Sequence, residues 1–411
     1  MWDRALEIFL KRFVTHGRLT VTLPSGKVIE AGDPAAPPYA IRITDPRIVR
    51  QLCLDPDMGL GEGYMDGKIL IQNDDLRALF NLIGLNFYRD TQLPLWQRPI
   101  GWARAALRNL MMINPASRSK SNVAHHYDLS GELYELFLDT DRQYSCAYWS
   151  RDDMTLEEAQ EAKKQHIARK LLLRPGMRVL DIGCGWGGMA LTLARDFGAR
   201  VVGVTLSEEQ LKIARARAQA AGLADRVEFH LMDYRKVEGA FDRIVSVGMF
   251  EHVGIPQYQT FFNKVRDLLT EDGVALLHTI GQNGVPQASS SWILKYIFPG
   301  GYTPALSDTA PRIEKAGLWI EDIEFLRLHY ARTLAAWHDR FMANIDRLPP
   351  AMDDRFKRMW RFYLLSMEMS FTQGRLMVQQ YQLSKAMLSV PITRDYLYPA
   401  DRAEALAHAA E

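Results

Sequence analysis

A cysteine stands among hydroxyl and aromatic side chains in the stretch Arg142–Trp149, RQYSCAYW. Such a thiol can be a covalent nucleophile, a metal ligand, a redox partner or a small apolar packing residue, and buried thiols as a class are most often inert. The three cysteines, Cys53, Cys146 and Cys184, are far apart and include no C-x-x-C pair. This usage argues against a disulfide framework or a zinc knuckle and favours a reducing cytosol. Packing is therefore the default interpretation of Cys146 unless neighbouring residues indicate chemistry. No metal site is expected.

A glycine-rich loop, Gly183–Gly188 (GCGWGG), follows the apolar segment MRVLDIG. Its glycines fit G-x-G-x-x-G, which lets the backbone turn sharply and approach a ligand closely, although this spacing alone is weak evidence. A dinucleotide site also needs an acidic residue about 20 positions further on, but the next apolar run closes as VTLS at residues 204–207. An NAD-dependent dehydrogenase is therefore disfavoured. VLDIGCGWG instead resembles the first motif of S-adenosylmethionine-dependent methyltransferases, and LMDYR at 231–235 lies where such folds contact the adenine.

Two polar motifs follow later apolar runs: GMFEHVG at 248–254, with Glu251, and LLHTIG at 276–281, with His278. Open α/β sheets bind ligands at the carboxyl ends of their strands. A single Glu or His at a strand end can equally be a helix cap or a satisfied polar group, so the two motifs gain weight only together with the glycine loop. The chain lacks the Asn-Pro-Pro-Tyr stretch of base-amine methylation.

Elements of two kinds must position these residues. After residue 121, short apolar runs alternate with amphipathic helical patterns, which predicts a mostly parallel sheet covered by helices. With the resemblance of the glycine loop, this implies a Rossmann-like α/β methyltransferase domain. Before it we expect a smaller N-terminal α+β domain at 1–88 and a connector at 89–120, so that the catalytic domain spans 121–411. The pattern at 18–32 predicts a hairpin, the glycines of MGLGEGYMDGKILI predict turns rather than helix, and the insertion at about 282–306 predicts a lid or a binding wall.

The amino-acid composition limits which partners, nucleic acid or membrane, the protein is expected to bind. Lys plus Arg number 50 against 49 acidic residues, which gives no general attraction to nucleic acid. No run is long and apolar enough for a signal peptide or a spanning helix, so a soluble or peripheral protein is expected. Residues 2–13 form an amphipathic pattern that suits either a membrane interface or packing on the chain's own domain, and the Arg/Trp-rich patch at 102–112 is either a linker helix or a contact for anionic headgroups.

The ordered motifs NVAHHYDLS, YSCAYW, GMRVLDIGCGWGG, VVGVTLSEEQ, FDRIVSVGMFEHVG, LLHTIG, YIFPGGY and RFKRMWRFY resemble those of cyclopropane-fatty-acyl-phospholipid synthases, which include the mycolic acid cyclopropane synthases. The resemblance covers about 121–385. It implies a cytoplasmic enzyme at the inner face of the membrane, and a possible homodimer. It also implies transfer of a methylene from S-adenosylmethionine to a cis double bond of an unsaturated phospholipid acyl chain, with bound bicarbonate as base. A methylene- or methyl-branched product and an inactive lipid-binding homologue remain alternatives.

The resemblance also implies the site residues. The bicarbonate ligands would be Cys146, Glu251, His278, Ile280 through its backbone, Tyr330 and Tyr127. The residues that bind S-adenosylmethionine would be Tyr144, Ser145, Gly183, Gly185, Thr205, Gln210, Asp233 and Tyr234. Cys146 would then be part of an anion pocket and would attack nothing. Aromatic faces can stabilise a cation, and the candidates for such walls are Tyr148, Trp149, Trp292, Tyr296 and Phe298.

One late segment departs from the family. Members often carry a cysteine followed by alanine before a phenylalanine, whereas YLLSMEMSFTQG places Met367 and Glu368 there, with Thr372 where arginine is common. A covalent thiol in that segment is excluded, and the sequence assigns Glu368 no role.

Overall fold

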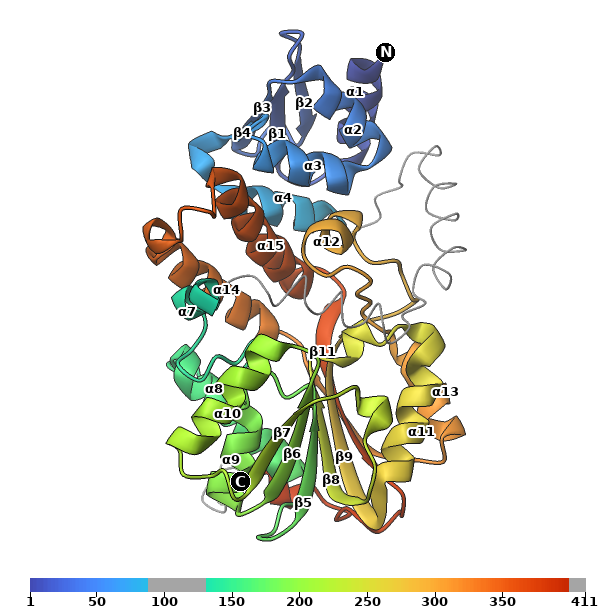
Figure 1. Ribbon diagram of the computed structural model, residues 1–411. Helices are drawn as coiled ribbons and strands as arrows, with labels where there is room; N and C mark the ends of the chain where they lie inside the picture. Colours follow the sequence, from blue (N-terminus) through green and yellow to red (C-terminus); the bar gives the residue numbers. More distant parts are fainter. Residues whose placement is uncertain (88–130, 399–411) are drawn as a thin grey trace, which may run out of the picture. The chain divides into compact units, whose positions relative to one another are not determined.

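The computed structural model describes residues 1–87 and 131–398 (Figure 1). They form two compact units. The N-terminal unit comprises residues 1–87, Gln287–Pro299 and Tyr330–Leu376, and the sheet unit comprises residues 131–286, Gly300–His329 and 377–398. Packing thus groups 287–299 and 330–376 with the N-terminal residues rather than with the rest of 121–411. The division into domains at 1–88, 89–120 and 121–411 stays a prediction.

The sheet unit is built on seven strands in the order β10-β11-β9-β8-β5-β6-β7. Neighbouring strands among β5 to β9 pair in parallel, and β10 pairs antiparallel with β11. The strands are β5 Arg178–Ile182, β6 Arg200–Thr205, β7 Val227–Leu231, β8 Phe241–Val247, β9 Leu269–Gln282, β10 Trp319–Leu326 and β11 Leu376–Ser384. Chain order reverses at β5, which lies between β6 and β8, so a switch point for ligand binding lies at the carboxyl ends of β5 and β8.

Helices cover both faces of this sheet (Figure 1). On one side lie α8 Leu156–Lys170, α9 Gly188–Phe197 and α10 Glu208–Ala220, and on the other lie α11 Tyr258–Leu268 and α13 Leu306–Lys315. The unit also contains α7 Gly131–Phe137. Its short 3-10 helices are Tyr234–Lys236, Phe250–His252, Ile255–Gln257 and Asp395–Leu397.

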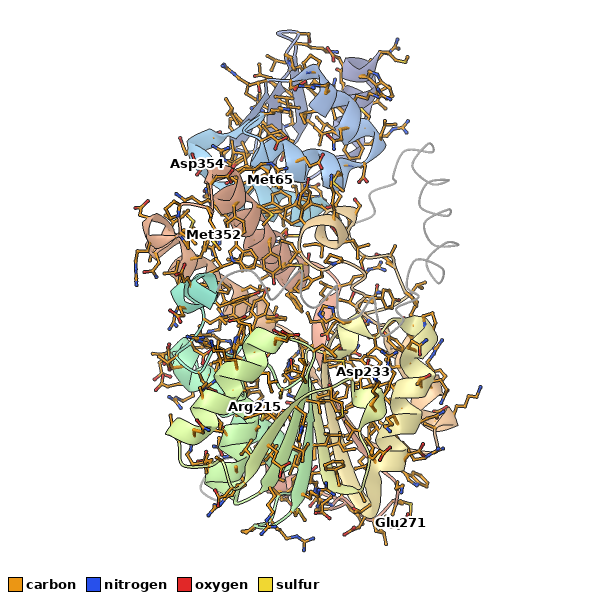
Figure 2. The ribbon with its side chains drawn as sticks, in the orientation of Figure 1. Met65, Arg215, Asp233, Glu271, Met352 and Asp354 are labelled. Atoms are coloured by element: carbon orange, nitrogen blue, oxygen red, sulfur yellow. The ribbon has the colours of Figure 1, made fainter. Side chains whose placement is uncertain are left out.

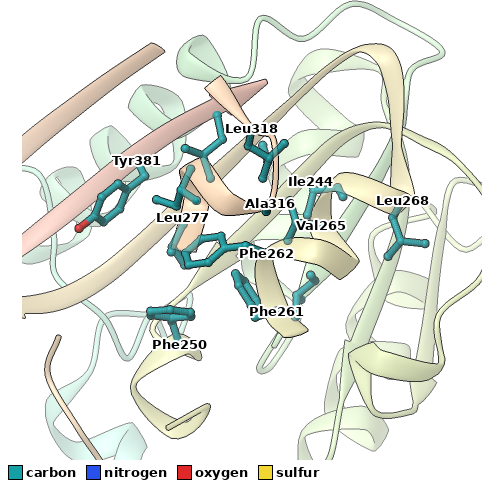
Figure 3. Packing of buried hydrophobic residues seen from close by; sticks show 14 of the residues in the cluster. Ile244, Phe250, Phe261, Phe262, Val265, Leu268, Leu277, Ala316, Leu318 and Tyr381 are labelled. Atoms are coloured by element: carbon teal, nitrogen blue, oxygen red, sulfur yellow. The ribbon is translucent and has the colours of Figure 1, made fainter. Parts of the chain in front are cut away.

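Two apolar cores result because neighbouring strand residues point to opposite faces. In β5, Val179 packs on the face of α8 to α10, whereas Leu180 packs on the face of α11 and α13. Leu276 and Leu277 of β9 divide in the same way. Figure 3 shows the second core, in which Phe250, Phe261 and Phe262 meet the strands. Strands that are buried on both faces have near-continuous apolar sequences. Such runs predicted the parallel sheet, and this prediction is confirmed.

The N-terminal unit holds a four-stranded sheet in the order β2-β1-β3-β4. Its strands are β1 Arg18–Thr22, β2 Val28–Gly32, β3 Pro38–Ile43 and β4 Ile69–Ile71. Its helices are α1 Trp2–Phe13, α2 Pro46–Leu54, α3 Pro56–Met65, α4 Leu76–Phe87, α12 Ser291–Tyr296, α14 His329–Ala343 and α15 Asp354–Thr372, with 3-10 helices at Gln72–Asp74 and Ile345–Arg347. β1 and β2 pair antiparallel, so the predicted hairpin is confirmed.

The prediction of turns in the glycine-rich segment is wrong at its start, because residues 56–65 form α3. The glycines permit close packing there rather than a change of direction. A Cβ at position 59 would lie 2.7 Å from the Leu52 backbone nitrogen, and one at position 61 would lie 2.2 Å from the Trp292 ring. Asp55 caps the helix and Pro56 begins it, a combination that favours helix despite three glycines.

Two other segments pack inside the N-terminal unit. Leu6, Phe9 and Leu10 of α1 are buried, so the apolar face of this helix forms part of the unit's own core. In the insertion, Trp292 is fully buried and its Nε1 lies 3.2 Å from the Met65 sulfur. Trp292 is therefore a core residue. Among the described residues, no helix combines the length and the apolar character needed to cross a bilayer.

Glu368 has a partner within the N-terminal unit. Its carboxylate accepts a hydrogen bond from Arg77 of α4 at 3.0 Å, and this ion pair joins α15 to α4. Burial raises the pKa of Glu368, and the neighbouring guanidinium opposes that rise. The contacts explain how an acid is accommodated in a mostly apolar helix.

Candidate active site

A cavity opens at the carboxyl ends of the sheet unit's parallel strands and contains about 1200 Å³ of atom-free space, part of it open to solvent. All eight residues predicted to bind S-adenosylmethionine line it: Tyr144, Ser145, Gly183, Gly185, Thr205, Gln210, Asp233 and Tyr234. In Figure 2, Asp233 lies at one end of the sheet and Glu271, near the start of β9, lies at the other. The fold thus gathers residues that span 90 positions of sequence.

The glycine loop has the backbone that its sequence predicts. Gly183 and Gly185 have φ values of +82° and +53°, a region that L side chains rarely adopt. A Cβ on Gly183 would also lie 2.8 Å from Met249 Cβ. Gly187, with φ +85°, stands at the start of α9, so the loop leads into a helix N-terminus, where backbone N–H groups are available to a ligand.

The stretch 142–149 is held by buried polar side chains of α8. Lys163 Nζ donates to Gln143 Oε1 at 2.7 Å and to Ser145 Oγ at 2.8 Å. Gln160 Nε2 donates to the carbonyls of Gln143 and Ser145 at 3.1 and 2.9 Å. Two α8 side chains thereby fix the backbone on both sides of Tyr144 and place Cys146 next to the cavity wall.

Other polar groups of the cavity are already oriented. Thr205 Oγ1 donates to Gln210 Oε1 at 2.9 Å. The Asp233 carboxylate accepts from the backbone and the guanidinium of Arg235. Burial opposes the charge of Asp233, but the bonds from Arg235 outweigh this effect and lower its pKa. A carboxylate is therefore held ionised after β7.

Asp181, the fourth residue of β5, lines the same cavity and was missed from the sequence. It is 2% exposed, and its Oδ2 has no hydrogen-bond partner within the described part of the chain. Burial raises the pKa of Asp181 to about 7, although the charge of Lys163 opposes the rise. An unsatisfied buried carboxylate oxygen is costly unless a ligand or water completes it. A carboxylate within the apolar run VLDIG was the signal available in the sequence.

Glu251 follows β8 in the 3-10 helix Phe250–His252, and its neighbours Met249 and His252 line the cavity. Its Oε1 accepts from the Ile280 backbone N–H at 2.6 Å. Its Oε2 is buried without a partner among residues 1–87 and 131–398. Burial raises the pKa of Glu251 to about 7, and the bond from Ile280 offsets only part of this effect. Because Ile280 N–H is engaged, Ile280 acts in this structure by orienting Glu251.

His278 and Cys146 belong to the same unit as Glu251. His278 is 2% exposed, and burial lowers its pKa well below the usual value, so its ring is neutral. The Cys146 thiol is 1% exposed and donates to the Ala147 carbonyl at 3.3 Å. Lys163 lies close enough to both groups for its charge to act on them. Burial lowers the pKa of Lys163 to about 8.

Two predicted anion ligands are not among the described residues of the sheet unit. Tyr330 belongs to the N-terminal unit, where its ring packs on Trp337 and Phe371 at centroid distances of 5.8 and 4.8 Å. Tyr127 lies outside the described residues. The roles of both tyrosines stay predictions.

The predicted aromatic walls differ in their surroundings. Tyr148 is stacked by the His166 ring at 4.2 Å and by the His329 ring at 4.9 Å, an arrangement that covers its faces. The Trp149 backbone N–H donates to His329 Nδ1 at 2.8 Å. Tyr296 donates to Glu62, and Phe298 packs edge-on against Tyr363, both within the N-terminal unit. Packing thus accounts for Tyr148, Tyr296 and Phe298, as it does for Trp292.

Comparison with known proteins identifies this architecture. The sequence profile of the family described as "Mycolic acid cyclopropane synthetase" matches residues 115–381. The chain belongs to this family. The "Cyclopropane-fatty-acyl-phospholipid synthase" of Escherichia coli (strain K12) is 39% identical over 350 residues, which cover 85% of this chain and 89% of that protein. The "Probable fatty acid methyltransferase" of Pseudomonas putida is 33% identical and covers 93% of this chain and 97% of its own length.

Among solved structures, "mycolic acid cyclopropane synthase CmaA1 complexed with SAH and CTAB" is similar, with a TM-score of 0.62 and 34% identity over 66% of this chain and 99% of that one. The family resemblance seen in the motifs is confirmed, and so are the methyltransferase fold and the assignment of the chain as an S-adenosylmethionine-dependent enzyme of this family.

Proposed function

We propose that this protein is a cyclopropane synthase that transfers a methylene from S-adenosylmethionine to a cis double bond of an unsaturated phospholipid acyl chain, with bound bicarbonate as the base. The observation that carries the proposal is Glu251: a buried carboxylate beside the cavity, with one oxygen held by Ile280 N–H and the other without a partner in the described residues. Such an oxygen is suited to accept a hydrogen bond from a bound bicarbonate hydroxyl.

The cavity suits S-adenosylmethionine. The glycine loop allows close backbone approach. The Asp181 oxygen that lacks a partner in the described segments and the Asp233 carboxylate offer acceptors for the ammonium, ribose or adenine groups. Gln210 stands where a dinucleotide site would carry an acid, and its amide oxygen is bound to Thr205. We therefore infer that Gln210 binds the ribose through its amide nitrogen. When bound, S-adenosylmethionine supplies an electrophilic methyl group on sulfur.

The reaction balances without a side-chain nucleophile. The alkene forms a bond to the methyl carbon as the sulfur–methyl bond breaks, which leaves a cation on the acyl chain. A base then removes one proton from the added methyl, and the released electron pair closes the ring. A nucleophile such as a thiolate beside the cation would trap it, so a buried thiol that donates to a carbonyl, as Cys146 does, suits this chemistry better than a reactive cysteine.

The chain's residues would hold the anion and not react with the lipid. Glu251 accepts from the bicarbonate hydroxyl, and neutral His278 donates to a bicarbonate oxygen. Cys146, Tyr330 and Tyr127 complete the proposed ligand set by family resemblance. Bicarbonate then takes the proton from the added methyl, a task that suits a general base held by short hydrogen bonds.

The second candidate is a fatty-acyl methyltransferase that produces a methylene- or methyl-branched chain. The Pseudomonas putida relative carries a fatty acid methyltransferase name and matches over nearly its whole length. The two reactions share the cation and differ in the proton that is lost, so product analysis separates them.

We also propose that the enzyme is cytoplasmic and reaches its lipid at the inner face of the membrane, with a possible homodimer. The reason is chemical, because a phospholipid acyl chain is presented by a bilayer. In this proposal the N-terminal residues and the connector at 89–120 guide docking or dimer contacts. Flotation with oleoyl-phospholipid vesicles, compared between the intact chain and a chain starting near Ser121, tests it: equal flotation and equal turnover of both chains would contradict it.

The experiment for the proposed function is gas chromatography with mass spectrometry of acyl chains from oleoyl-phospholipid vesicles. The vesicles are incubated with the protein and S-adenosylmethionine, with and without bicarbonate. A saturated-ring product one methylene heavier than the substrate, formed more slowly without bicarbonate, is expected. A product of the same mass that keeps its unsaturation would replace the proposal with the second candidate. Absence of any lipid product would overturn both.

A further inference from the structure

Three glutamines of β11, Gln379, Gln380 and Gln382, are at most 1% exposed. Three fully buried amides in one strand are costly unless each has a purpose or a partner. Gln382 has structural partners, because it donates to the Lys170 carbonyl at 2.6 Å and accepts from Tyr396 at 2.8 Å. Gln379 Oε1 accepts from the Tyr381 hydroxyl. Gln380 is the glutamine that contacts a predicted site residue.

The orientation of the Gln380 amide is set by Lys170, the last residue of α8. Lys170 Nζ lies 2.9 Å from Gln380 Oε1. An ammonium group only donates hydrogen bonds, so the amide oxygen must face Lys170 and the amide nitrogen must face away. Although burial lowers the pKa of Lys170, Glu324 lies 2.5 Å from its ammonium and opposes this effect.

The Gln380 nitrogen lies 3.0 Å from His278 Nδ1. The amide nitrogen is a donor, so Nδ1 must accept and therefore carries no proton. His278 is neutral because it is buried, and a neutral imidazole has a single N–H. The proton consequently resides on Nε2, which leaves that nitrogen as the donor of the ring.

We propose that Gln380 is a positioning residue that fixes His278 in the Nε2–H tautomer, with Lys170 fixing the amide of Gln380. The consequence for catalysis rests on the proposed function: Nε2–H donates to bicarbonate, whereas the other tautomer would turn a lone pair toward the anion. The partner of the second ring nitrogen commonly decides which nitrogen of a histidine is protonated.

The test uses the intact protein labelled with ¹⁵N-histidine, and the His278 ring signals are identified by their loss in His278→Asn. In the parent protein we expect an unprotonated Nδ1 and a protonated Nε2. In Gln380→Glu, a carboxylate faces Nδ1 and attracts the proton, so the pattern should reverse. The matched control is Gln382→Glu, which changes the same residue type on the same strand and should leave the His278 signals unchanged.

Activity provides the second measurement. Gln380→Glu should raise the bicarbonate concentration for half-maximal turnover by about ten-fold, the effect of losing one charge-assisted hydrogen bond, and should leave the KM for S-adenosylmethionine unchanged. A merely structural role would change both parameters together or neither.

A proton on Nδ1 in the parent protein, or no reversal in a folded Gln380→Glu variant, would overturn the proposal. If the tautomer reverses while turnover never depends on bicarbonate in any variant, the positioning role of Gln380 stands and the proposed base is wrong.

Discussion

Glu251 and Glu324 are both carboxylates set in the sheet unit, yet their surroundings move their pKa values in opposite directions. Burial alone would raise both. At Glu324, hydrogen bonds from His166 at 2.6 Å and Lys170 at 2.5 Å, together with the charges of these groups, outweigh burial and lower the pKa to about 2. At Glu251 burial outweighs the hydrogen bonds that oppose it, of which the one from the Ile280 N–H is the strongest, and the pKa rises to about 7.

The difference separates an acid that serves the structure from an acid that is available to a ligand. Glu324 uses one oxygen to hold the buried ends of His166 and Lys170, whose side chains are 5% and 1% exposed. Glu251 keeps one buried oxygen without a partner in the described residues. Unsatisfied buried groups persist where function requires them. Asp181, with its raised pKa and an oxygen that has no partner among the described residues, resembles Glu251 in this respect.

The largest effect is expected from Glu251→Gln. This substitution keeps the shape and the bond from Ile280 but removes the charged acceptor that would hold bicarbonate, the proposed general base. General acid–base catalysis typically contributes about 10²- to 10⁴-fold in rate. We expect kcat/KM for lipid to fall by about 10³-fold, measured as product formed from vesicles. The control is Glu271→Gln near the start of β9, where the side chain is 95% exposed. Equal turnover of Glu251→Gln and the parent protein would remove Glu251 from the site.

The same substitution, Glu251→Gln, should increase the stability of the folded protein even though it lowers turnover. The folded state holds the Glu251 proton more tightly than the unfolded chain, since its pKa is about 7 against an ordinary 4.5. The contribution of Glu251 to the free energy of unfolding therefore falls as pH rises from 4.5 to about 7 and is constant above that. The shift corresponds to about 3 kcal/mol.

Glutamine does not titrate, so Glu251→Gln should gain stability relative to the parent protein across this pH range. Urea unfolding at several pH values between 5 and 8 measures the difference. A difference that stays constant with pH would show that Glu251 has an ordinary pKa.

A smaller effect, a loss of stability, is expected from Glu324→Gln. The substitution leaves the buried Lys170 ammonium without its charged partner. Breaking a fully buried pair costs about 3–5 kcal/mol, and the Glu324 side chain is 31% exposed, so we expect a loss of about 2 kcal/mol. Urea unfolding at pH 7 measures it. An unchanged midpoint would mean that Lys170 is readily hydrated or loses its proton in the folded state.

The smallest effect is expected from Glu368→Gln in the N-terminal unit. Its partner Arg77 is 39% exposed, and solvent-exposed pairs contribute about 1 kcal/mol or less. Unfolding should shift by less than about 1 kcal/mol, and turnover should match that of the parent protein. A marked loss of turnover without a loss of stability would assign Glu368 a role in lipid binding or chemistry.

Local sequence predicted those parts of the site that a short backbone segment can build. The glycines at 183 and 185 adopt the positive φ values that their spacing indicated, and all eight cofactor residues line one cavity. The hairpin and the parallel strands were also predicted correctly, because turn residues and apolar runs are local patterns within a few positions of sequence.

The failures share a physical cause, which is packing against distant segments. The glycines of α3 predicted turns, but contacts with Leu52 and Trp292 accommodate them in a helix. No role was predicted from the sequence for Lys163 and Gln160, which are buried against the stretch around Cys146.

The sequence by itself determined the alternation of parallel strands and helices, the glycine loop and the family, since these depend on residue types at fixed spacing. Only the tertiary structure decided which carboxylates are paired, which nitrogen of His278 carries the proton and what Glu368 contacts. The reason is that pairing and burial are set by neighbours up to some 290 positions away, as Arg77 and Glu368 are, and no local pattern records them.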